Sequence, residues 1–288
     1  MAGYKGVPTI RKRLIGSQLR RLREGQGMSV EAAAEKMGVG AFTVRRQEYG
    51  QVVVSVADAK AYGEIYQADD ALLQRLVGLA KHGRARGWWS AYNTTIGPSL
   101  IDVADAEDLA VDIKTWQPLV VPAILQTREY SEAVISVSRS LSTPERPLPV
   151  DDLVSLRERR KEILTREHPP RVWAIIGEAA IQQRVGGDGV MRAQLQHLLN
   201  LSQLPHVNLQ LLPFDAGAHL GMGGAFVVMG FDETLDGSIT LVESAGTNVF
   251  NDEPLEVGRA STQFSHLQAQ AMGTDDTRRY LLKAVSAK

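Results

Sequence analysis

The chain of 288 residues is longer than the roughly 100–200 residues of one ordinary domain, and its content of 44% hydrophobic and 23% charged residues is typical of a folded globular protein, so we expect two domains. It has no cysteine, which excludes disulfides, thiolate zinc sites and cysteine nucleophiles within the chain. No apolar run approaches the roughly 18 residues of a membrane span and the N-terminus has no apolar signal core, so we expect a cytoplasmic protein without a membrane partner.

The charge is divided unevenly along the chain. Residues 1–50 hold ten Lys and Arg against four acids, a balance of +6, and because the formal net charge of the whole chain is −1 the remainder must carry −7. Such a division indicates a nucleic-acid-binding part joined to a second part with a different role.

The first predicted helix spans residues 10–24. Ile15, Leu19 and Leu22 recur there at helical spacing and give the helix one apolar face. Its outer face is expected to carry five basic residues, namely Arg11, Lys12, Arg13, Arg20 and Arg23.

Residues 28–50 have the pattern of a helix-turn-helix. Ser29 is suited to cap a helix over 30–37, and a second helix is predicted over 41–48 after a glycine-containing turn. Two helices of about eight residues joined in this way form the motif, and the basic helix before them supplies a third packing partner. The inward face of the pair is expected to hold Ala33, Met37, Val39 and Val44.

Two more helices complete the expected first domain. Ser55 and the aspartate three residues later resemble a capping box, and Asp69 or Asp70 caps the last helix. We therefore predict an all-α domain of about five helices over 1–86 and a second domain over 87–288.

The second domain is predicted to mix strands and helices. The apolar segments "RVWAIIGE", "VNLQLLPF", "AFVVMGF" and "ITLVESA" are typical of strands. The segment "VMRAQLQHLLNLS" predicts a helix that Asp188 caps, the prolines of "QPLVVPAILQ" exclude a regular helix, and "STPERPLP" (142–149) predicts a loop. This pattern indicates an α+β domain with a mixed or antiparallel sheet of about four strands, and with further helices over 105–115, 127–138 and 151–164.

The helix over 41–48 carries the side chains expected to read DNA. A guanidinium can bond guanine O6 and N7 together, which makes Arg45 and Arg46 base-edge candidates, and an apolar side chain can contact a thymine methyl. The alternative is a plain pair of packed helices with solvated arginines, and the +6 balance favours the DNA interpretation. The full candidate set is Arg45 and Arg46 with Phe42 and Ala41 for bases, Thr43 and Arg23 for phosphates, and Arg20.

Residues 10–66 resemble the lambda-repressor/Cro-like, or Xre-type, helix-turn-helix, through "LRRLRE", "AAEKMGV" and "TVRRQEYG". The resemblance implies a transcriptional regulator that binds double-stranded operator DNA. A homodimer is expected because one short helix reads few bases, whereas two units about 34 Å apart read half-sites spaced by roughly 10 base pairs. Val30 stands where the family commonly has a Gln that reaches a phosphate, and Gly40 replaces a usual Ser, so one anchor and one cap side chain are missing.

The rest of the chain also resembles a known family. The segments "GWWSAY", "PPRVWAIIGEAAIQQRVGG", "LPHVNLQLLPFDAGAHLGMGGAF" and "NDEP" are similar to the C-terminal domain of uncharacterised function found in many actinobacterial regulators with a helix-turn-helix. The resemblance implies a small partner protein encoded nearby and, in some members, toxin–antitoxin-like or developmental regulation. It implies neither a fold nor an activity.

The segment "WQPLVVPAILQTREY", residues 116–130, is the predicted ligand- or partner-binding wall. Two prolines in an apolar run leave backbone amides unpaired and side chains prominent, although a buried interdomain seam has the same pattern. Candidate contacts are Trp116, Pro118, Leu119, Pro122, Leu125, Gln126 and Tyr130, with His219 from a later loop.

Catalysis, a metal site and a cofactor are not expected. The chain has no HExxH, GxSxG or Walker spacing, and none of its six histidines forms an i, i+4 pair. Candidate polar groups are Glu178, Asp215, His219, Glu243 and Asp252; His219 near Asp215 is the most conspicuous as a general base, but a loop histidine is more often a hydrogen-bonding strut. "GAHLGMGG" (217–224) is either an anion-binding loop or a flexible connection between strands.

The sequence therefore predicts a DNA-binding regulator whose second domain senses a small-molecule effector or a partner protein. An antitoxin-like protein that binds a small neighbour and regulates its own gene is the first alternative. An enzyme that uses His219 is the second.

Overall fold

The computed structural model describes residues 10–82, 87–92, 95–138, 149–231, 237–244 and 247–287. The chain divides into two compact units, the first formed by 1–93, 97–109 and 231–237, and the second by 94–96, 110–230 and 238–288. The predicted boundary after Arg86 falls at residues outside the described ranges. Within those ranges, no helix is long and apolar enough to cross a membrane.

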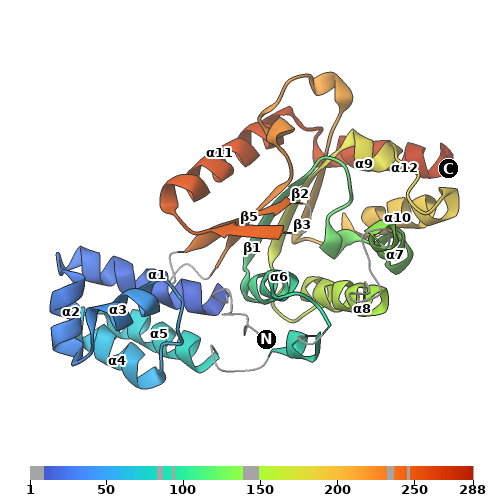
Figure 1. Ribbon diagram of the computed structural model, residues 1–288. Coiled ribbons are helices and arrows are strands. Elements are labelled where there is room, and N and C mark those ends of the chain that lie inside the picture. Colours follow the sequence, from blue (N-terminus) through green and yellow to red (C-terminus); the bar gives the residue numbers. More distant parts are fainter. Residues whose placement is uncertain are drawn as a thin grey trace. The chain divides into compact units, whose positions relative to one another are not determined.

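The first unit is helical, as predicted, and its first five α-helices fall where the sequence places them (Figure 1). The 3-10 helix η1 and the helix α6 follow them in the same unit. The elements are α1 (Ile10–Gly25), α2 (Val30–Met37), α3 (Ala41–Glu48), α4 (Val56–Ile65), α5 (Asp70–His82), η1 (Trp88–Tyr92) and α6 (Pro98–Leu109).

Short-range caps set the boundaries of these helices. Ser29 Oγ accepts a hydrogen bond of 3.1 Å from Ala32 N at the start of α2. At α4 the capping box is complete, because Ser55 and Asp58 each accept a bond from the other's backbone amide. Residues close in sequence thus satisfy amides that a helix leaves without partners at its first turn.

Helices α1 and α3 pack backbone against backbone. A Cβ added at Gly16 of α1 would lie 2.5 Å from the carbonyl oxygens of Gln47 and Glu48, so only glycine permits this approach. Around this contact Ile10, Leu19 and Val44 are fully buried.

The second unit is built on a mixed six-stranded sheet, in which the strand order is β3-β2-β1-β4-β5-β6. The pairs β3–β2 and β2–β1 are parallel, and the pairs from β1 to β6 are antiparallel. The prediction of about four strands was too low, because β1 and β6 were missed. The strands are β1 (Asp112–Gln117), β2 (Arg171–Gly177), β3 (Val207–Leu212), β4 (Phe226–Gly230), β5 (Ser238–Ser244) and β6 (Thr247–Asn251).

Strand β1 corrects the helix predicted over 105–115. Helix α6 already ends at Leu109, and Ile113 and Thr115 then point into the core from a strand that pairs on both sides. The run "IDVADAEDLAVDIKTW" holds neither Gly nor Pro, so the sequence does not mark this change from helix to strand.

Helices and 3-10 turns connect and cover the strands (Figure 1). Two predicted caps were displaced by one or two residues: Pro149 occupies the N-cap of α8 in place of Asp151, and Gly187 that of α10 in place of Asp188. The predicted loop over 142–149 lies outside the described residues except for Pro149. The elements are η2 (Ala123–Leu125), α7 (Arg128–Val137), α8 (Val150–Arg160), η4 (Lys161–Leu164), α9 (Glu178–Gln182), α10 (Asp188–Leu201), η5 (Phe214–Ala216), η6 (Leu220–Gly223), α11 (Pro254–Gln270) and α12 (Thr274–Ala287).

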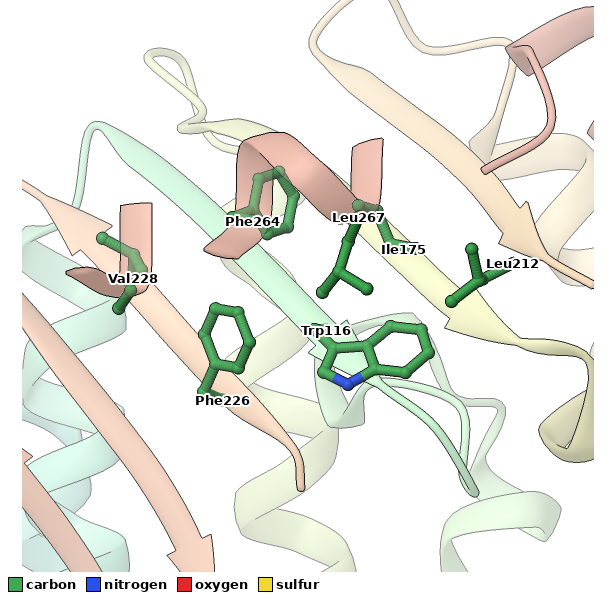
Figure 2. Packing of buried hydrophobic residues seen from close by; sticks show 8 residues of the cluster. Trp116, Ile175, Leu212, Phe226, Val228, Phe264 and Leu267 are labelled. Atoms are coloured by element: carbon green, nitrogen blue, oxygen red, sulfur yellow. The ribbon is translucent and has the colours of Figure 1, made fainter. Parts of the chain in front are cut away.

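Helix α11 covers one face of the sheet. Phe264 and Leu267 of α11 pack on Trp116, Phe226 and side chains of neighbouring strands (Figure 2). This cluster holds α11 against the sheet.

The chain itself closes the outer edge of β3. The amide of Leu211 donates to Thr277 Oγ1 at 3.0 Å, and the amide of Met272 donates to the Leu211 carbonyl at 2.8 Å. Backbone groups that an edge strand leaves open are therefore bonded here to the segment around the start of α12.

Candidate nucleic-acid interface

A buried ion pair fixes α3 against α1. Arg23 Nε and Nη2 donate to the two carboxylate oxygens of Glu48 at 2.7 and 3.0 Å, and Arg23 Nη1 donates to the carbonyl of Met28 at 2.8 Å. The hydrogen bond to Glu48 raises the pKa of Arg23, and the Glu48 side chain is only 2% exposed. Arg23 thus joins three segments of the helix-turn-helix from inside.

This geometry corrects the predicted phosphate contact of Arg23, because its guanidinium is buried and its donors are used within the protein. Arg11, predicted on the outer face of α1, is also buried, with Nε 2.7 Å from Asp105 Oδ1 of α6. Val39 was predicted to point inward and is exposed. The burial of the two arginines arises from tertiary ion pairs that helical periodicity does not report.

The outward face of α3 carries an exposed aromatic ring and two arginines. Phe42 is 72% exposed, and the Arg46 guanidinium lies 5.5 Å from its ring centroid. Arg45 is exposed and bonds Glu31 of α2 through Nη2 at 3.1 Å. A pair this accessible to solvent contributes little stability, so Arg45 can exchange Glu31 for a phosphate or a base at small cost.

The remaining candidates surround this face. Thr43 is exposed and Ala41 half-buried on α3. Arg20 of α1 lies over the ring of Tyr49 at 5.5 Å and bonds Glu24 at 2.9 Å. Six of the seven predicted DNA-binding residues are therefore at least partly open to solvent, and only Arg23 is buried.

The start of α3 lacks a side-chain cap, as the Gly40 substitution implies. Gly40 occupies the N-cap position and makes no side-chain hydrogen bond. No N-cap side chain therefore accepts a hydrogen bond from the first amides of α3. A helix N-terminus attracts anions, so a phosphate is favoured at this position.

Acidic side chains of α6 gather at the basic start of α1. Burial and the neighbouring Asp105 raise the pKa of Asp102 to about 7, against the opposing effect of Arg13 and Lys12. Burial also raises the pKa of Asp105, whereas Arg11 lowers it. Asp102 is thus a buried carboxyl that titrates near neutral pH.

The predicted binding wall over 116–130 is largely interior. Trp116, Leu125, Gln126 and Tyr130 are almost fully buried, Pro122 is buried and Pro118 half-buried, so among the apolar residues of the segment only Leu119, at 57%, is exposed. The segment is part of the core of the second unit, which corrects its interpretation as a prominent surface.

Gln126 shows what the proline-interrupted backbone requires. Its Nε2 donates to the Val121 carbonyl at 2.7 Å, and its Oε1 accepts from Ser131 Oγ at 2.8 Å and from Arg157 Nη1 at 2.9 Å. The amide of Val121 donates to the hydroxyl of Tyr130 at 3.3 Å. Buried side chains, rather than a ligand, satisfy the polar backbone groups of this segment.

His219 holds a turn. Its Nδ1 accepts a hydrogen bond of 3.1 Å from Gly221 N, and its ring packs on Trp116 in a T-shaped arrangement with the ring centroids 5.4 Å apart. The Gly221 carbonyl in turn accepts from Trp116 Nε1 at 2.9 Å. These contacts support the strut interpretation. Among the described residues, no group of three His, Cys, Asp or Glu is placed to hold a metal ion.

A groove of about 910 Å³ lies beside α11 in the second unit. Its floor includes Phe226, Val242 and Val249, which are cross-strand neighbours on β4, β5 and β6 and so share one face of the sheet. Successive turns in the first half of α11 form one wall of the groove, and η6 forms part of its rim. The predicted segment 116–130 contributes none of its lining.

Sequence reasoning missed this groove because its lining comes from η6, three strands and α11. The available signal was "GAHLGMGG", whose second half supplies rim residues, although it suggested an anion loop or a flexible connection rather than an apolar rim.

Comparisons with known families match both units. A helix-turn-helix domain family matches residues 14–76, and the family described as "Domain of unknown function (DUF5753)" matches residues 100–283. Neither the curated proteins nor the solved structures gave a match. The chain therefore belongs to the DUF5753 family and carries a helix-turn-helix domain ahead of that region.

Proposed function

We propose that the protein is an Xre-type transcriptional regulator that binds operator DNA as a homodimer, and whose second unit senses a small molecule or a partner protein. The observation that carries the DNA role is the outward face of α3, where Phe42 is exposed, Arg46 lies over its ring and Arg45 is exposed in a weak pair with Glu31. These groups are suited to thymine methyls, guanine edges and phosphates.

Rigidity supports the same role. Arg23 and Glu48 tie α3 to α1, and Gly16 brings the two helix backbones together, so the exposed side chains of α3 start from a fixed frame. A preorganised reading helix loses little conformational entropy when it binds.

The role proposed for the second unit is binding rather than catalysis. His219, the most conspicuous candidate base, contacts Gly221 and Trp116, whereas the groove beside α11 offers an open apolar floor. A pocket of this kind is the usual form of a ligand site.

The test is binding of the full chain to DNA from the region upstream of its own gene, measured across salt concentrations. Several phosphate contacts require log K to fall with log salt at a slope of about −0.9 per phosphate. Arg46→Ala should cost about 1–3 kcal/mol of DNA-binding free energy and relax sequence preference, whereas Arg192→Ala, at an exposed position of α10 in the second unit, should change neither. A salt-independent affinity, or equal loss in both variants, would refute the proposal.

A further inference from the structure

The groove beside α11 has an exposed apolar floor and wall. Val242 and Val249 of the floor are 47% and 54% exposed, and Leu255 at the start of α11 is 66% exposed. Side chains of this kind are normal when scattered, but here they border one hollow whose base is the buried ring of Phe226. A concentration of apolar surface in a concave site marks a place that binds something.

The lining of the groove carries no net charge. Glu256 and Arg259 are the charged residues among the lining, and Arg259 Nη1 bonds Glu256 Oε1 at 2.6 Å. Both side chains are exposed, Arg259 at 65% and Glu256 at 43%, so the pair itself is weak, but the lining carries no net charge that would attract a ligand anion or cation. Charge complementarity therefore points to a neutral occupant.

Polar groups of the lining are also engaged within the protein. Thr262 Oγ1 donates to the Gly258 carbonyl at 2.9 Å, and Asn251 Oδ1 accepts from the amide of Glu253 at 2.9 Å. Because these bonds already satisfy side-chain atoms, an occupant needs few polar groups of its own.

Gly258 leaves the backbone of α11 open on the side of the groove. It lies within α11 and lines the groove, and a Cβ added there would meet no atom within 4 Å. Glycine inside a helix costs about 1 kcal/mol relative to alanine, and no neighbour in this chain requires it. Gly78 of α5 and Gly189 of α10 are helical glycines with the same open space, so Gly258 alone does not indicate a ligand; it leaves room for an occupant to lie directly against the backbone of α11.

The size of the hollow matches a small molecule. A volume of about 910 Å³ falls within the range of roughly 300–1,000 Å³ that ligand pockets occupy. Floor and wall enclose the occupant from two sides, and the floor extends across three strands, which favours an elongated shape.

We propose that this groove binds an elongated, uncharged and largely hydrocarbon small molecule, whose body lies along α11 against Gly258 and over Phe226, Val242 and Val249. This assignment rests on the proposed sensing role of the second unit and gives it a site and a ligand class.

The experiment measures binding of the neutral fluorescent probe N-phenyl-1-naphthylamine to the full chain. Gly258→Leu fills the groove and should weaken probe binding by about tenfold or more. Gly189→Leu is the matched control, because Gly189 is also a helical glycine of the second unit, in α10, with no atom within 4 Å of an added Cβ. It should bind the probe like the unchanged protein.

A second pair of variants guards against misfolding. Val249→Asp places a charge at the groove floor and should also weaken the probe, whereas Leu282→Asp on α12 replaces an equally exposed apolar residue, at 55%, and should not. Absence of probe binding by the unchanged protein, or equal binding by both members of either pair, overturns the assignment.

Two parallel measurements separate this inference from its premises. If Gly258→Leu converts a dimer into a monomer in sedimentation, the occupant is a second copy and the small-molecule assignment is wrong. DNA affinity is measured on the same samples. If the unchanged protein does not bind DNA, the regulator proposal alone is refuted. If it binds DNA but not the probe, the ligand assignment of the groove alone is refuted.

Discussion

Replacement of Arg23 by methionine separates a structural role from a DNA contact. Arg23→Met keeps a side chain of similar length and its apolar packing, but removes both bonds to Glu48 and the bond to the Met28 carbonyl. It leaves the Glu48 carboxylate, which is 2% exposed, without its cationic partner.

The expected cost follows from that buried charge. Loss of one partner of a buried ion pair destabilises by about 3–5 kcal/mol, whereas replacement of both partners by apolar residues is often neutral. The free energy of unfolding of an ordinary domain is about 5–15 kcal/mol, so Arg23→Met should remove a large share of the stability of the first unit. The double variant Arg23→Met/Glu48→Leu should recover most of it.

Peptide-resolved hydrogen–deuterium exchange on the full chain is the suitable assay, because it reports α1 to α3 separately from the second unit. Arg23→Met should speed exchange in these helices, the double variant should restore slow exchange, and DNA affinity should follow exchange. The reasoning would be refuted by a variant with unchanged exchange, weaker DNA binding and a salt slope reduced by about one phosphate, since Arg23 would then contact DNA directly.

Two further predictions concern the first unit. Asp102 has a pKa of about 7 against an ordinary 3.8, so the folded state binds its proton more tightly and stability should fall as pH rises from about 4 to 7. Asp102→Asn should therefore stabilise the unit at pH 8 by a few kcal/mol, about 4 at most, and flatten this dependence in thermal melts; an unchanged pH profile would contradict it. Gly16→Ala should destabilise the unit by about 1–3 kcal/mol in urea unfolding, because the added Cβ would lie 2.5 Å from the Gln47 carbonyl oxygen. Gly25→Ala, where an added Cβ meets open space, should not. Equal effects of the two variants would show that α1 and α3 can separate freely.

Local signals predicted the helical unit well. Ser29 and Ser55 mark helix starts through bonds to residues three positions later, and such bonds depend on little outside their own turn. The partners of Arg11 and Arg23 lie 94 and 25 residues away, so no local pattern distinguished these buried arginines from solvated ones.

The second unit was harder to predict for the same reason. Strand β1 follows α6 after two residues, without a glycine or proline to mark the change. The apolar run 116–130 was noticed, but burial of Trp116 and Gln126 depends on α8, α11 and η6, which are distant in sequence. Recognition of the family indicated the extent of this region, and only the sheet register brought the groove residues together.

The closed edge of β3 has a consequence for biosynthesis. During translation, Leu211 and the rest of the parallel half of the sheet leave the ribosome about 60 residues before Met272 and Thr277, which bond to that edge. A product that stops between these positions retains the complete helix-turn-helix but leaves a sheet edge open to pairing with other chains. Such truncated chains should therefore aggregate through the second unit while the first is still folded.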